Sequence, residues 1–388
     1  MLYRQLGKTK EKVSILGFGA MRLPTIKNNA DVDEEETFRM LDYGITHGIN
    51  LIDTAYPYHG KKLGDRGKSE AVIGRFLDEN SYRDDVLIST KSPSWLIEKE
   101  SEFEYYLNQQ LKSLKTDYAD IYLLHSLTER EWKKVHELNV LDFLDDCLES
   151  GRVKHVGFSA HTEIDYVIEI IDEYPKWEVV LTQMNYLDEY YQSGVMGLDY
   201  LKGQNIGSMV MEPLRGGRLV ENIPESVQNL WNQAEVKRTP LQWAFQYLFN
   251  RDDVDCVLSG MSSLEQVKEN VEIASAIDKI SDYDQELIRE VAREYRSFIG
   301  NECTRCGYCM PCPHGVDIIN CFAEYNIAHM MNNPKASAMQ YFSLIGDESR
   351  ADSCIRCMEC ENICPQMLNI PEELEKVSEY FGDEFDHF

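Results

Sequence analysis

Nine of the eleven cysteines lie between positions 303 and 364, and their spacing constrains the last third of the chain. Two intervening residues let a looped backbone direct successive thiolates at one small metal cluster. Structural zinc fits less well, because zinc sites usually pair two C-x2-C units across a longer spacer. The cysteines form two runs and leave Cys321 over: Cys303, Cys306, Cys309 and Cys312, then Cys354, Cys357, Cys360 and Cys364.

The second run, C-x2-C-x2-C-x3-C followed by Pro365, resembles the pattern of bacterial two-cluster ferredoxins. The resemblance implies two [4Fe–4S] clusters, in which the fourth cysteine of each run binds the other cluster. The first run has two residues rather than three before Cys312, so Cys321 is kept as a reserve ligand. The implied ligand sets are Cys303, Cys306, Cys309 and Cys364 for one cluster, and Cys354, Cys357, Cys360 and Cys312 for the other.

The chain is strongly acidic, with 67 acidic against 39 basic residues and a formal net charge of −28. This balance argues against a nucleic-acid partner, because phosphate binding needs clustered Lys and Arg. It suits docking on a basic redox protein, although an ordinary solvated acidic surface explains it more simply. No stretch is long and apolar enough to span a bilayer, and residues 1–7 lack the apolar core of a signal peptide. We therefore expect a cytoplasmic location, where disulfides are not favoured.

The first 275 residues alternate short β-rich runs with amphipathic helical stretches such as 35–47 and 98–114. Such alternation predicts right-handed βαβ units and a parallel sheet. Eight units over this length predict an α/β fold of the (β/α)8 TIM-barrel type. A doubly wound open sheet is the alternative, weakened because no G-x-G-x-x-G opens a helix after the first strand. The expected strands are 13–20, 50–55, 86–92, 118–126, 153–160, 179–186, 206–213 and 254–261.

These patterns predict that the chain has three parts. Residues 1–275 form the barrel, residues 276–299 form a connecting helix, and residues 300–388 form a mainly helical, ferredoxin-like iron–sulfur domain.

Catalytic groups of such barrels lie at the C-terminal ends of strands. Reading those positions gives Asp53, Tyr58, Lys91 and His125. A nearby ammonium is expected to lower the pKa of a tyrosine, and a carboxylate would hold that ammonium. A histidine would orient a carbonyl through a hydrogen bond. The set predicts a general acid that protonates an oxygen while hydride arrives at carbon.

Residues 1–275 resemble the aldo-keto reductase family, most specifically in D-T-A-x-x-Y at positions 53–58. Segments 67–74, 157–159, 183–186 and 260–270 also resemble that family. The resemblance implies a barrel that binds NADP(H) or NAD(H), with Asp53, Tyr58, Lys91 and His125 as the catalytic tetrad. The implied substrate is a small-molecule carbonyl or alcohol.

The resemblance also implies contacts with the nucleotide cofactor. Ser159 and Gln183 would hold the nicotinamide carboxamide, and Met211 stands where an aromatic residue often stacks on the nicotinamide. Where the family often has Asn after the serine, this chain has Ala160 and then His161. The remaining contacts fall on a Gly-rich loop and on the start of the last barrel helix: Pro213, Leu214, Gly216 and Arg218 for pyrophosphate, and Gly260, Ser262, Gln266 and Asn270 for the adenosine end.

Nicotinamide transfers two electrons as hydride whereas each cluster transfers one, so a direct relay is awkward without a flavin or radical intermediate. The preferred prediction is an oxidoreductase whose carbonyl or alcohol chemistry is coupled to electron transfer through the clusters, with a flavin as a possible further cofactor. One alternative is an electron-carrier module for a partner enzyme. The other is an ordinary carbonyl reductase whose clusters are structural or sense oxygen.

Overall fold

A computed structural model describes residues 1–26, 31–61, 64–382 and 385 of the chain. The chain divides into two compact units, each assembled from two segments. The first unit contains Met1–Pro213 and Gln242–Ile280, and the second contains Leu214–Leu241 and Ser281–Phe388. No helix in the described part of the chain has the length and apolar character that crossing a membrane would require.

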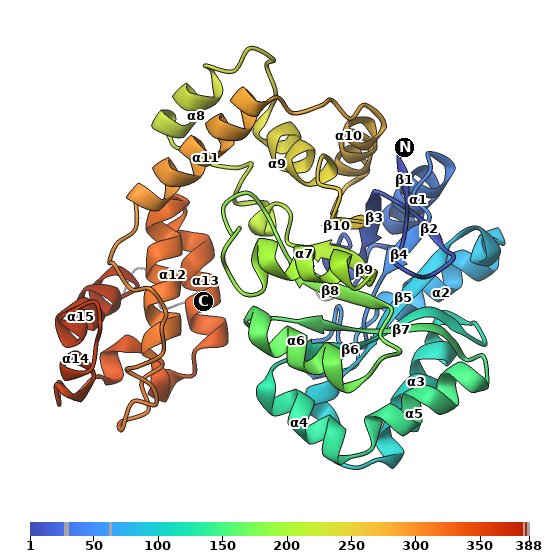
Figure 1. Cartoon of the computed structure of the whole chain (residues 1–388), viewed down its shortest axis with the longest axis horizontal. Coiled ribbons are helices and arrows are strands. Elements are labelled where there is room, and N and C mark those ends of the chain that lie inside the picture. The colour runs from blue at the N-terminus through green and yellow to red at the C-terminus, as the bar shows by residue number, and fades with distance from the viewer. Residues whose placement is uncertain (27–30, 62–63, 383–384, 386–388) are drawn as a thin grey trace. The chain divides into compact units, whose positions relative to one another are not determined.

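The first unit is built on eight parallel strands that close into a barrel in the order β10-β3-β4-β5-β6-β7-β8-β9 (Figure 1). Each strand overlaps one of the eight predicted from the sequence, so the predicted barrel is confirmed and the open-sheet alternative is wrong. The strands are β3 (Leu16–Gly19), β4 (Leu51–Asp53), β5 (Leu87–Ser92), β6 (Ala119–Leu127), β7 (Val153–Ala160), β8 (Val179–Gln183), β9 (Gly207–Met211) and β10 (Cys256–Gly260).

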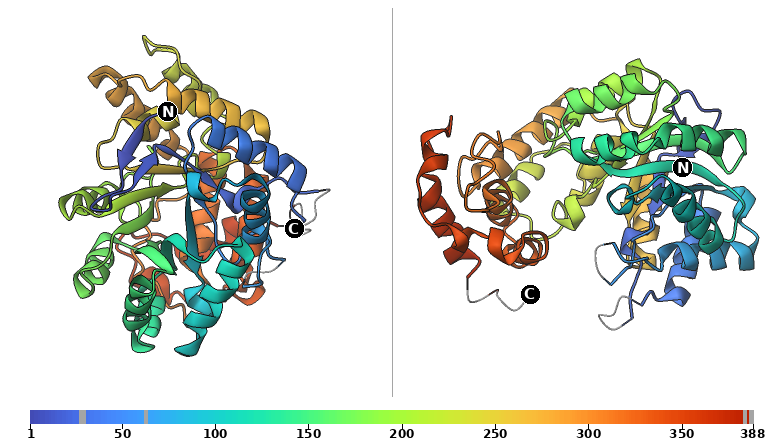
Figure 2. Two further views of the ribbon diagram at one scale, coloured as in Figure 1. Left: turned by 90° about the vertical axis from the view of Figure 1, so that its right-hand side faces the viewer. Right: turned by 90° about the horizontal axis from the view of Figure 1, so that it is seen from below.

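Helices connect the strands and surround the barrel (Figure 2). The predicted helices 35–47 and 98–114 correspond to α1 and α3, and α3 buries an apolar face that includes Phe103, Leu107 and Leu111. The helices of this part of the chain are α1 (Glu34–Thr46), α2 (Ser69–Asn80), α3 (Ser101–Leu114), α4 (Glu129–Glu137), α5 (Val140–Glu149), α6 (Ile164–Glu173), α7 (Gly194–Gly203), α9 (Pro240–Phe249) and α10 (Leu264–Ser275). Short 3-10 turns are η1 (Ala20–Arg22), η2 (Arg83–Asp85) and η3 (Ser94–Leu96).

An antiparallel hairpin of β1 (Tyr3–Gln5) and β2 (Lys12–Ser14) precedes the barrel. The predicted strand 13–20 is therefore split, because β2 pairs with β1 whereas β3 pairs with β4 and β10. Leu6 and Val13 of the hairpin segment join the apolar cluster inside the barrel, which also contains Leu123 and Leu258. A side chain at Gly207 would come within 2.7 Å of Leu6, so the hairpin closes tightly on the start of β9.

The second unit is helical (Figure 1). A capping box of Ser281 and Asp284 begins α11, which agrees with the helical pattern predicted over residues 283–298. The boundaries at 275 and 299 remain our proposal for the domain limits. The helices are α8 (Glu225–Trp231), α11 (Asp282–Ser297), α12 (Ile318–Met330), α13 (Pro334–Leu344), α14 (Glu359–Asn362) and α15 (Ile370–Tyr380), with 3-10 turns η4 (Arg215–Gly217), η5 (Asp347–Ser349) and η6 (Ala351–Ser353).

An apolar core fixes the cysteine-bearing loops of this unit onto its helices. Ile318 and Phe322 of α12 pack with Tyr341 of α13 and with Leu374 and Val377 of α15. Several of the cysteines, including Cys303, Cys312, Cys354 and Cys364, pack against this core.

Candidate active site and cluster sites

Three neighbouring strands bring the predicted catalytic side chains together. Asp53 is the last residue of β4, and Lys91 lies near the end of β5, which pairs with β4 in parallel register. The Lys91 Nζ atom lies 2.6 Å from Asp53 Oδ2 and donates to the Thr54 carbonyl at 2.8 Å and to the Tyr58 hydroxyl at 3.1 Å. The lysine ammonium therefore links the carboxylate and the phenol directly.

The Asp53–Lys91 pair is buried, with exposed fractions of 3% and 0%. Burial acts to lower the pKa of Lys91, but the charge of Asp53, the interaction with Tyr58 and the hydrogen bonds to both together outweigh it and raise the pKa, so the ammonium persists at neutral pH. Burial raises the pKa of Asp53, while the charge and hydrogen bond of Lys91 oppose that rise. Ser89 also donates to Asp53 Oδ1 at 2.8 Å, and together these contacts hold an ionised pair.

Tyr58 differs from the expectation drawn from the sequence. Burial raises its pKa, and the opposing charge of Lys91 does not overcome that effect. The expected net lowering is therefore wrong for the protein without substrate, because desolvation of the phenolate is the larger cause. The phenol stays protonated at neutral pH, as a general acid must before the reaction. Since Lys91 donates to the phenol oxygen, the Tyr58 proton is free to point elsewhere.

His125 of β6 completes the group. Its ring lies edge-on to Tyr58 with a centroid separation of 5.9 Å, and Trp95 lies 5.0 Å away. Burial, followed by the charge of Lys91, lowers the pKa of His125 well below 6.5, so the imidazole is neutral. Its Nδ1 atom is buried and has no hydrogen-bond partner among the described residues. A neutral imidazole can donate one hydrogen bond without adding charge to the site.

A buried polar network that we did not predict lies behind Lys91. Thr90 and Gln110 donate to Glu70 Oε1 at 2.7 and 2.8 Å, and Tyr122 donates to Gln110 at 3.1 Å. Gln110 also donates to the Lys91 carbonyl at 3.0 Å, so the network fixes the backbone that carries the ammonium. Burial raises the pKa of Glu70. The sequence held a signal: Glu70 shares the buried face of α2 with Ile73 and Gly74.

The predicted nicotinamide contacts lie at the same end of the barrel. Ser159 pairs in register with Leu181, and Gln183 with Met211, at the ends of β7, β8 and β9. Ser159 Oγ accepts a hydrogen bond from the Ser126 amide at 2.7 Å, which leaves its hydroxyl proton available. Gln183 donates to Asp188 at 3.0 Å, which fixes the amide plane. These polar groups suit a carboxamide, which both donates and accepts.

The predicted pyrophosphate loop crosses the division between the two units. Pro213 ends a segment of the first unit, whereas Leu214, Gly216 and Arg218 belong to the second. Gly216 has a φ of +70°, and Arg218 donates to the Ala336 carbonyl at 3.3 Å.

The predicted adenosine contacts surround the start of α10. Ser263 caps the helix by accepting from the Gln266 amide, and Gln266 Oε1 accepts from the Ser262 amide at 2.7 Å. Gly260 ends β10, and buried Asn270 donates to Ser259 at 3.1 Å. All four predicted residues thus lie on one β–turn–helix segment, where Asn270 already has a structural partner.

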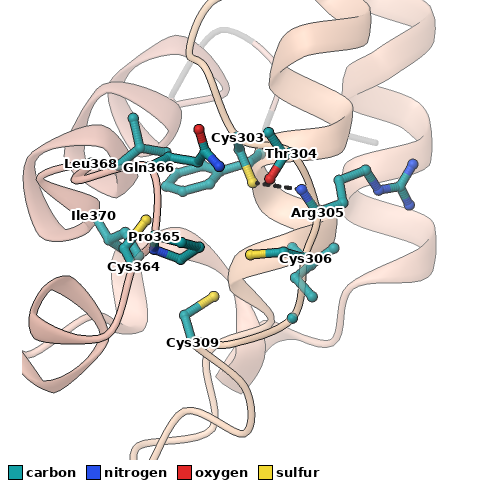
Figure 3. Close-up of a pocket in the computed structure, with 13 residues that line it drawn as sticks. Cys303, Thr304, Arg305, Cys306, Cys309, Cys364, Pro365, Gln366, Leu368 and Ile370 are labelled. Atoms are coloured by element: carbon teal, nitrogen blue, oxygen red, sulfur yellow. Dashed lines mark hydrogen bonds between the residues drawn. The ribbon is translucent and has the colours of Figure 1, made fainter.

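Four cysteines surround the first hollow in the iron–sulfur unit (Figure 3). Cys303, Cys306 and Cys309 come from one loop, and Cys364 comes from the other run. The Arg305 amide donates to Cys303 Sγ at 3.4 Å, which is the type of hydrogen bond that stabilises a cluster thiolate. This is the set implied by the ferredoxin resemblance.

A second hollow is lined by the complementary set, Cys312, Cys354, Cys357 and Cys360. Cys321 lines neither hollow: it is buried in α12, with its sulfur 3.8 Å from the Ser349 carbonyl. Within the described ranges, no group of three His, Cys, Asp or Glu side chains could hold a single metal ion. Thiols around a hollow suit a multi-atom cluster, whereas zinc would need ligands that converge on one point.

The two loops repeat the same backbone shape. Arg305 and Arg356, which precede the middle cysteines, have φ angles of +61° and +60°. Gly307 and Met358, which follow them, have φ angles of +79° and +66°. Those middle cysteines, Cys306 and Cys357, are exposed residues that also line the hollows, so each hollow lies near the protein surface.

Comparisons with known proteins identify a reductase part and an iron–sulfur part of the chain. Residues 15–293 match the aldo/keto reductase family, and residues 302–369 match a 4Fe-4S dicluster domain. The chain belongs to the aldo/keto reductase family and carries an iron–sulfur domain of the ferredoxin type. It is therefore an oxidoreductase, to which the two matches assign nicotinamide and iron–sulfur cofactors.

Two curated relatives each match about three quarters of the chain. L-galactose dehydrogenase of Arabidopsis thaliana is 27% identical over 74% of this chain and 92% of its own length. NADH-specific methylglyoxal reductase of Escherichia coli is 25% identical over 74% of this chain and 97% of its own length. The solved structure of the aldo-keto reductase AKR11C1 from Bacillus halodurans covers 75% of this chain with a TM-score of 0.63 at 24% identity, which supports the fold alone.

Proposed function

We propose that this chain reduces a small-molecule carbonyl, or oxidises the corresponding alcohol, with NAD(P)H or NAD(P)⁺. The observation that carries the proposal is the buried Lys91 ammonium, which lies 2.6 Å from Asp53 and 3.1 Å from the Tyr58 hydroxyl. Such an arrangement can stabilise the phenolate that forms when a tyrosine gives up its proton.

Each side chain of the tetrad has one role in the proposed reaction. Tyr58 donates its proton to the carbonyl oxygen, and Lys91 stabilises the resulting phenolate. Asp53 holds the ammonium, and neutral His125 donates a hydrogen bond that orients the carbonyl. The nicotinamide, when bound, supplies the hydride to the carbonyl carbon. Ser159, Gln183 and Met211 would hold the nicotinamide, and the remaining predicted contacts, residues 213–218 and 260–270, would hold the rest of the nucleotide.

The names of two relatives point to small hydroxylated or dicarbonyl substrates. One relative is named for L-galactose and the other for methylglyoxal. The relative named for methylglyoxal is also named for NADH. We extend to this chain only the class of substrate, a small aldehyde or ketone, and leave the choice between NADPH and NADH to measurement.

We further propose two [4Fe–4S] clusters, held by the cysteine sets that line the two hollows. Each cluster, when bound, carries one electron. The exposed residues Cys306 and Cys357 would bring each cluster near the protein surface, where it could exchange an electron with a redox protein. That exposure favours coupling of the barrel chemistry to electron transfer over a purely structural role for the clusters.

Isotope transfer tests the barrel chemistry. The substrate would be reduced with NADPH or NADH carrying deuterium at both positions of nicotinamide carbon 4. Direct hydride transfer predicts deuterium on the former carbonyl carbon. Solvent hydrogen at that carbon would contradict direct transfer, because exchange through a flavin or the clusters would lose the label.

Spectroscopy after anaerobic purification tests the coupling. Reduced nicotinamide or the alcohol substrate should bleach the iron–thiolate absorption within the turnover time if electrons reach the clusters. Flavin content should be measured on the same sample, because a flavin would join two-electron to one-electron chemistry. Clusters that keep their absorption throughout turnover would contradict coupling.

A further inference from the structure

A polar group outside the predicted tetrad lies at the same end of the barrel. His161 follows the last residue of β7, and its Nδ1 atom lies 3.4 Å from the amide nitrogen of Gln192. Glu212, directly after β9, is close enough for its charge to act on His161. The imidazole and the amide therefore meet at this end of the barrel, and Glu212 follows the end of β9 there.

The segments that carry these side chains are held in place. Asn185 accepts from the amides of Leu187 and Asp188 at 3.0 Å, which shapes the loop after β8. Thr182 and Ser193 share a hydrogen bond of 2.7 Å that closes the loop next to Gln192.

The same asparagine also fixes Glu212. Asn185 Nδ2 donates to the Glu212 carbonyl at 3.2 Å. Glu212 has a φ of +55°, a backbone conformation that costs energy for a residue other than glycine. A strained and tethered backbone at a strand end is a feature often found where a side chain must be aimed at a ligand.

This group adjoins the tetrad. Leu127 of β6 pairs in register with Ala160, and the Ser126 amide bonds to Ser159 Oγ at 2.7 Å. These contacts bring the strand ends that carry His125 and His161 together. A substrate whose carbonyl lies between Tyr58 and His125 would thus have its neighbouring carbons near His161.

The group can both donate hydrogen bonds to a ligand and accept them from it. Gln192 Nε2 can only donate, so His161 Nδ1 accepts from it, and the Nε2 atom of a neutral ring carries the proton and can donate to a ligand. Desolvation lowers the pKa of His161, which favours this neutral ring. Gln192 Oε1 is buried without a hydrogen-bond partner among the described residues. Glu212 contributes a carboxylate, which accepts only. A hydroxyl group can accept a hydrogen bond from His161 and donate one to Gln192 or Glu212, whereas an anionic phosphate or carboxylate on the substrate would be repelled by Glu212.

We propose that His161, Gln192 and Glu212 form a specificity site that binds a hydroxyl group next to the substrate carbonyl and disfavours anionic substrates. The proposal rests on the proposed carbonyl chemistry and names its substrate class: a neutral, hydroxylated aldehyde or ketone. A site built to bind a hydroxyl discriminates strongly against an analogue that lacks it, because its polar groups are then left unpaired.

The test compares three aldehydes on the purified, cluster-loaded full chain: glyceraldehyde, propanal and glyceraldehyde 3-phosphate. We expect kcat/KM for glyceraldehyde to exceed that for propanal by roughly tenfold or more. His161→Ala should bring that ratio toward one. Glu212→Gln should raise the ratio of the phosphorylated to the neutral triose. Glu163→Gln, an exposed carboxylate at the start of α6, is the matched control and should change neither ratio.

The outcomes separate the two proposals. Reduction of propanal and glyceraldehyde with equal kcat/KM by the wild-type chain would overturn the specificity site while leaving carbonyl reduction intact. Preferences that stay unchanged in both variants would also overturn it. Absence of reduction with every aldehyde would contradict the proposed function itself. Thermal unfolding of His161→Ala and Glu212→Gln should match the wild type, and Gln192→Leu gives a second route to the same change in ratio.

Discussion

Gly307 and Met358 occupy equivalent places in the two cysteine loops, each directly after the middle cysteine, and both have positive φ angles of +79° and +66°. Glycine adopts this conformation freely, whereas another residue is strained by roughly 1–2 kcal/mol. At this position the first loop therefore avoids a backbone strain that Met358 introduces in the second loop.

Substitution of these two residues should have opposite effects. Gly307→Ala should lower the free energy of unfolding by about 1 kcal/mol, because its side chain would meet no atom closer than 4.0 Å and only the backbone conformation opposes it. Met358→Gly should cost less than that or stabilise the chain. Gly346→Ala is the control, since Gly346 has a φ of −60° and open space around it. Denaturant unfolding of the cluster-loaded proteins measures all three, and equal losses for Gly307→Ala and Gly346→Ala would contradict the argument.

The two hollows predict which cysteines hold iron. Cys312→Ala should lose about half of the bound iron, because it removes one ligand of one of two clusters. Cys321→Ala should keep the wild-type iron content, since Cys321 lines neither hollow. Iron and acid-labile sulfide analysis of the two variants tests this prediction. Loss of iron in Cys321→Ala but not in Cys312→Ala would make Cys321 the fourth ligand.

The buried network behind Lys91 predicts that the hydrogen bonds accepted by the Glu70 side chain matter more for catalysis than its charge. Glu70→Gln keeps an oxygen that can accept from Thr90 and Gln110, so kcat should stay within about threefold of the wild type. Glu70→Ala removes the acceptor of the buried Thr90 hydroxyl and one acceptor of Gln110, which keeps the Lys91 carbonyl, and should cost about 1–3 kcal/mol of stability together with a fall in kcat. Glu79→Ala, exposed on the same helix, serves as the control. A large shift of the pH–rate profile in Glu70→Gln would show instead that the charge of Glu70 acts on Tyr58.

His155 predicts a dependence of stability on pH. Burial acts to lower its pKa, but Glu178 at 2.9 Å and Glu11 at 3.7 Å outweigh it and raise the pKa above 6.5. Its stabilising contribution is present below 6.5 and is lost as the pH rises through the raised value. Urea unfolding between about pH 6 and about pH 9 should therefore show a steeper loss of stability in the wild type than in His155→Gln. Parallel curves for the two proteins would contradict this assignment.

The sequence predicted the barrel because each strand carried a local pattern. It did not predict the β1–β2 hairpin, whose strands of three residues are too short for alternation to be visible. It also did not predict that residues 214–241 join the second unit, since that grouping depends on contacts between distant segments, such as Arg238 with Asp284.

The sequence also predicted which side chains form the candidate site, but not all of their partners. Asp53, Lys91 and His125 stand at strand ends, and the order of strands in a closed barrel places them side by side. The partners of Glu70 and of His161 come from other strands and loops, so spacing alone could not pair them. The net direction of the Tyr58 pKa was wrong because it depends on burial, which the sequence does not state.

The most direct test of the central claim is the rate of carbonyl reduction by Tyr58→Phe. The variant keeps the ring beside Lys91 and His125 but removes the hydroxyl that would protonate the substrate oxygen. With iron content and thermal unfolding equal to the wild type, we predict a loss of kcat of roughly a hundredfold or more, as expected for removal of a general acid. Wild-type kcat in Tyr58→Phe, with clusters and fold intact, would contradict the account.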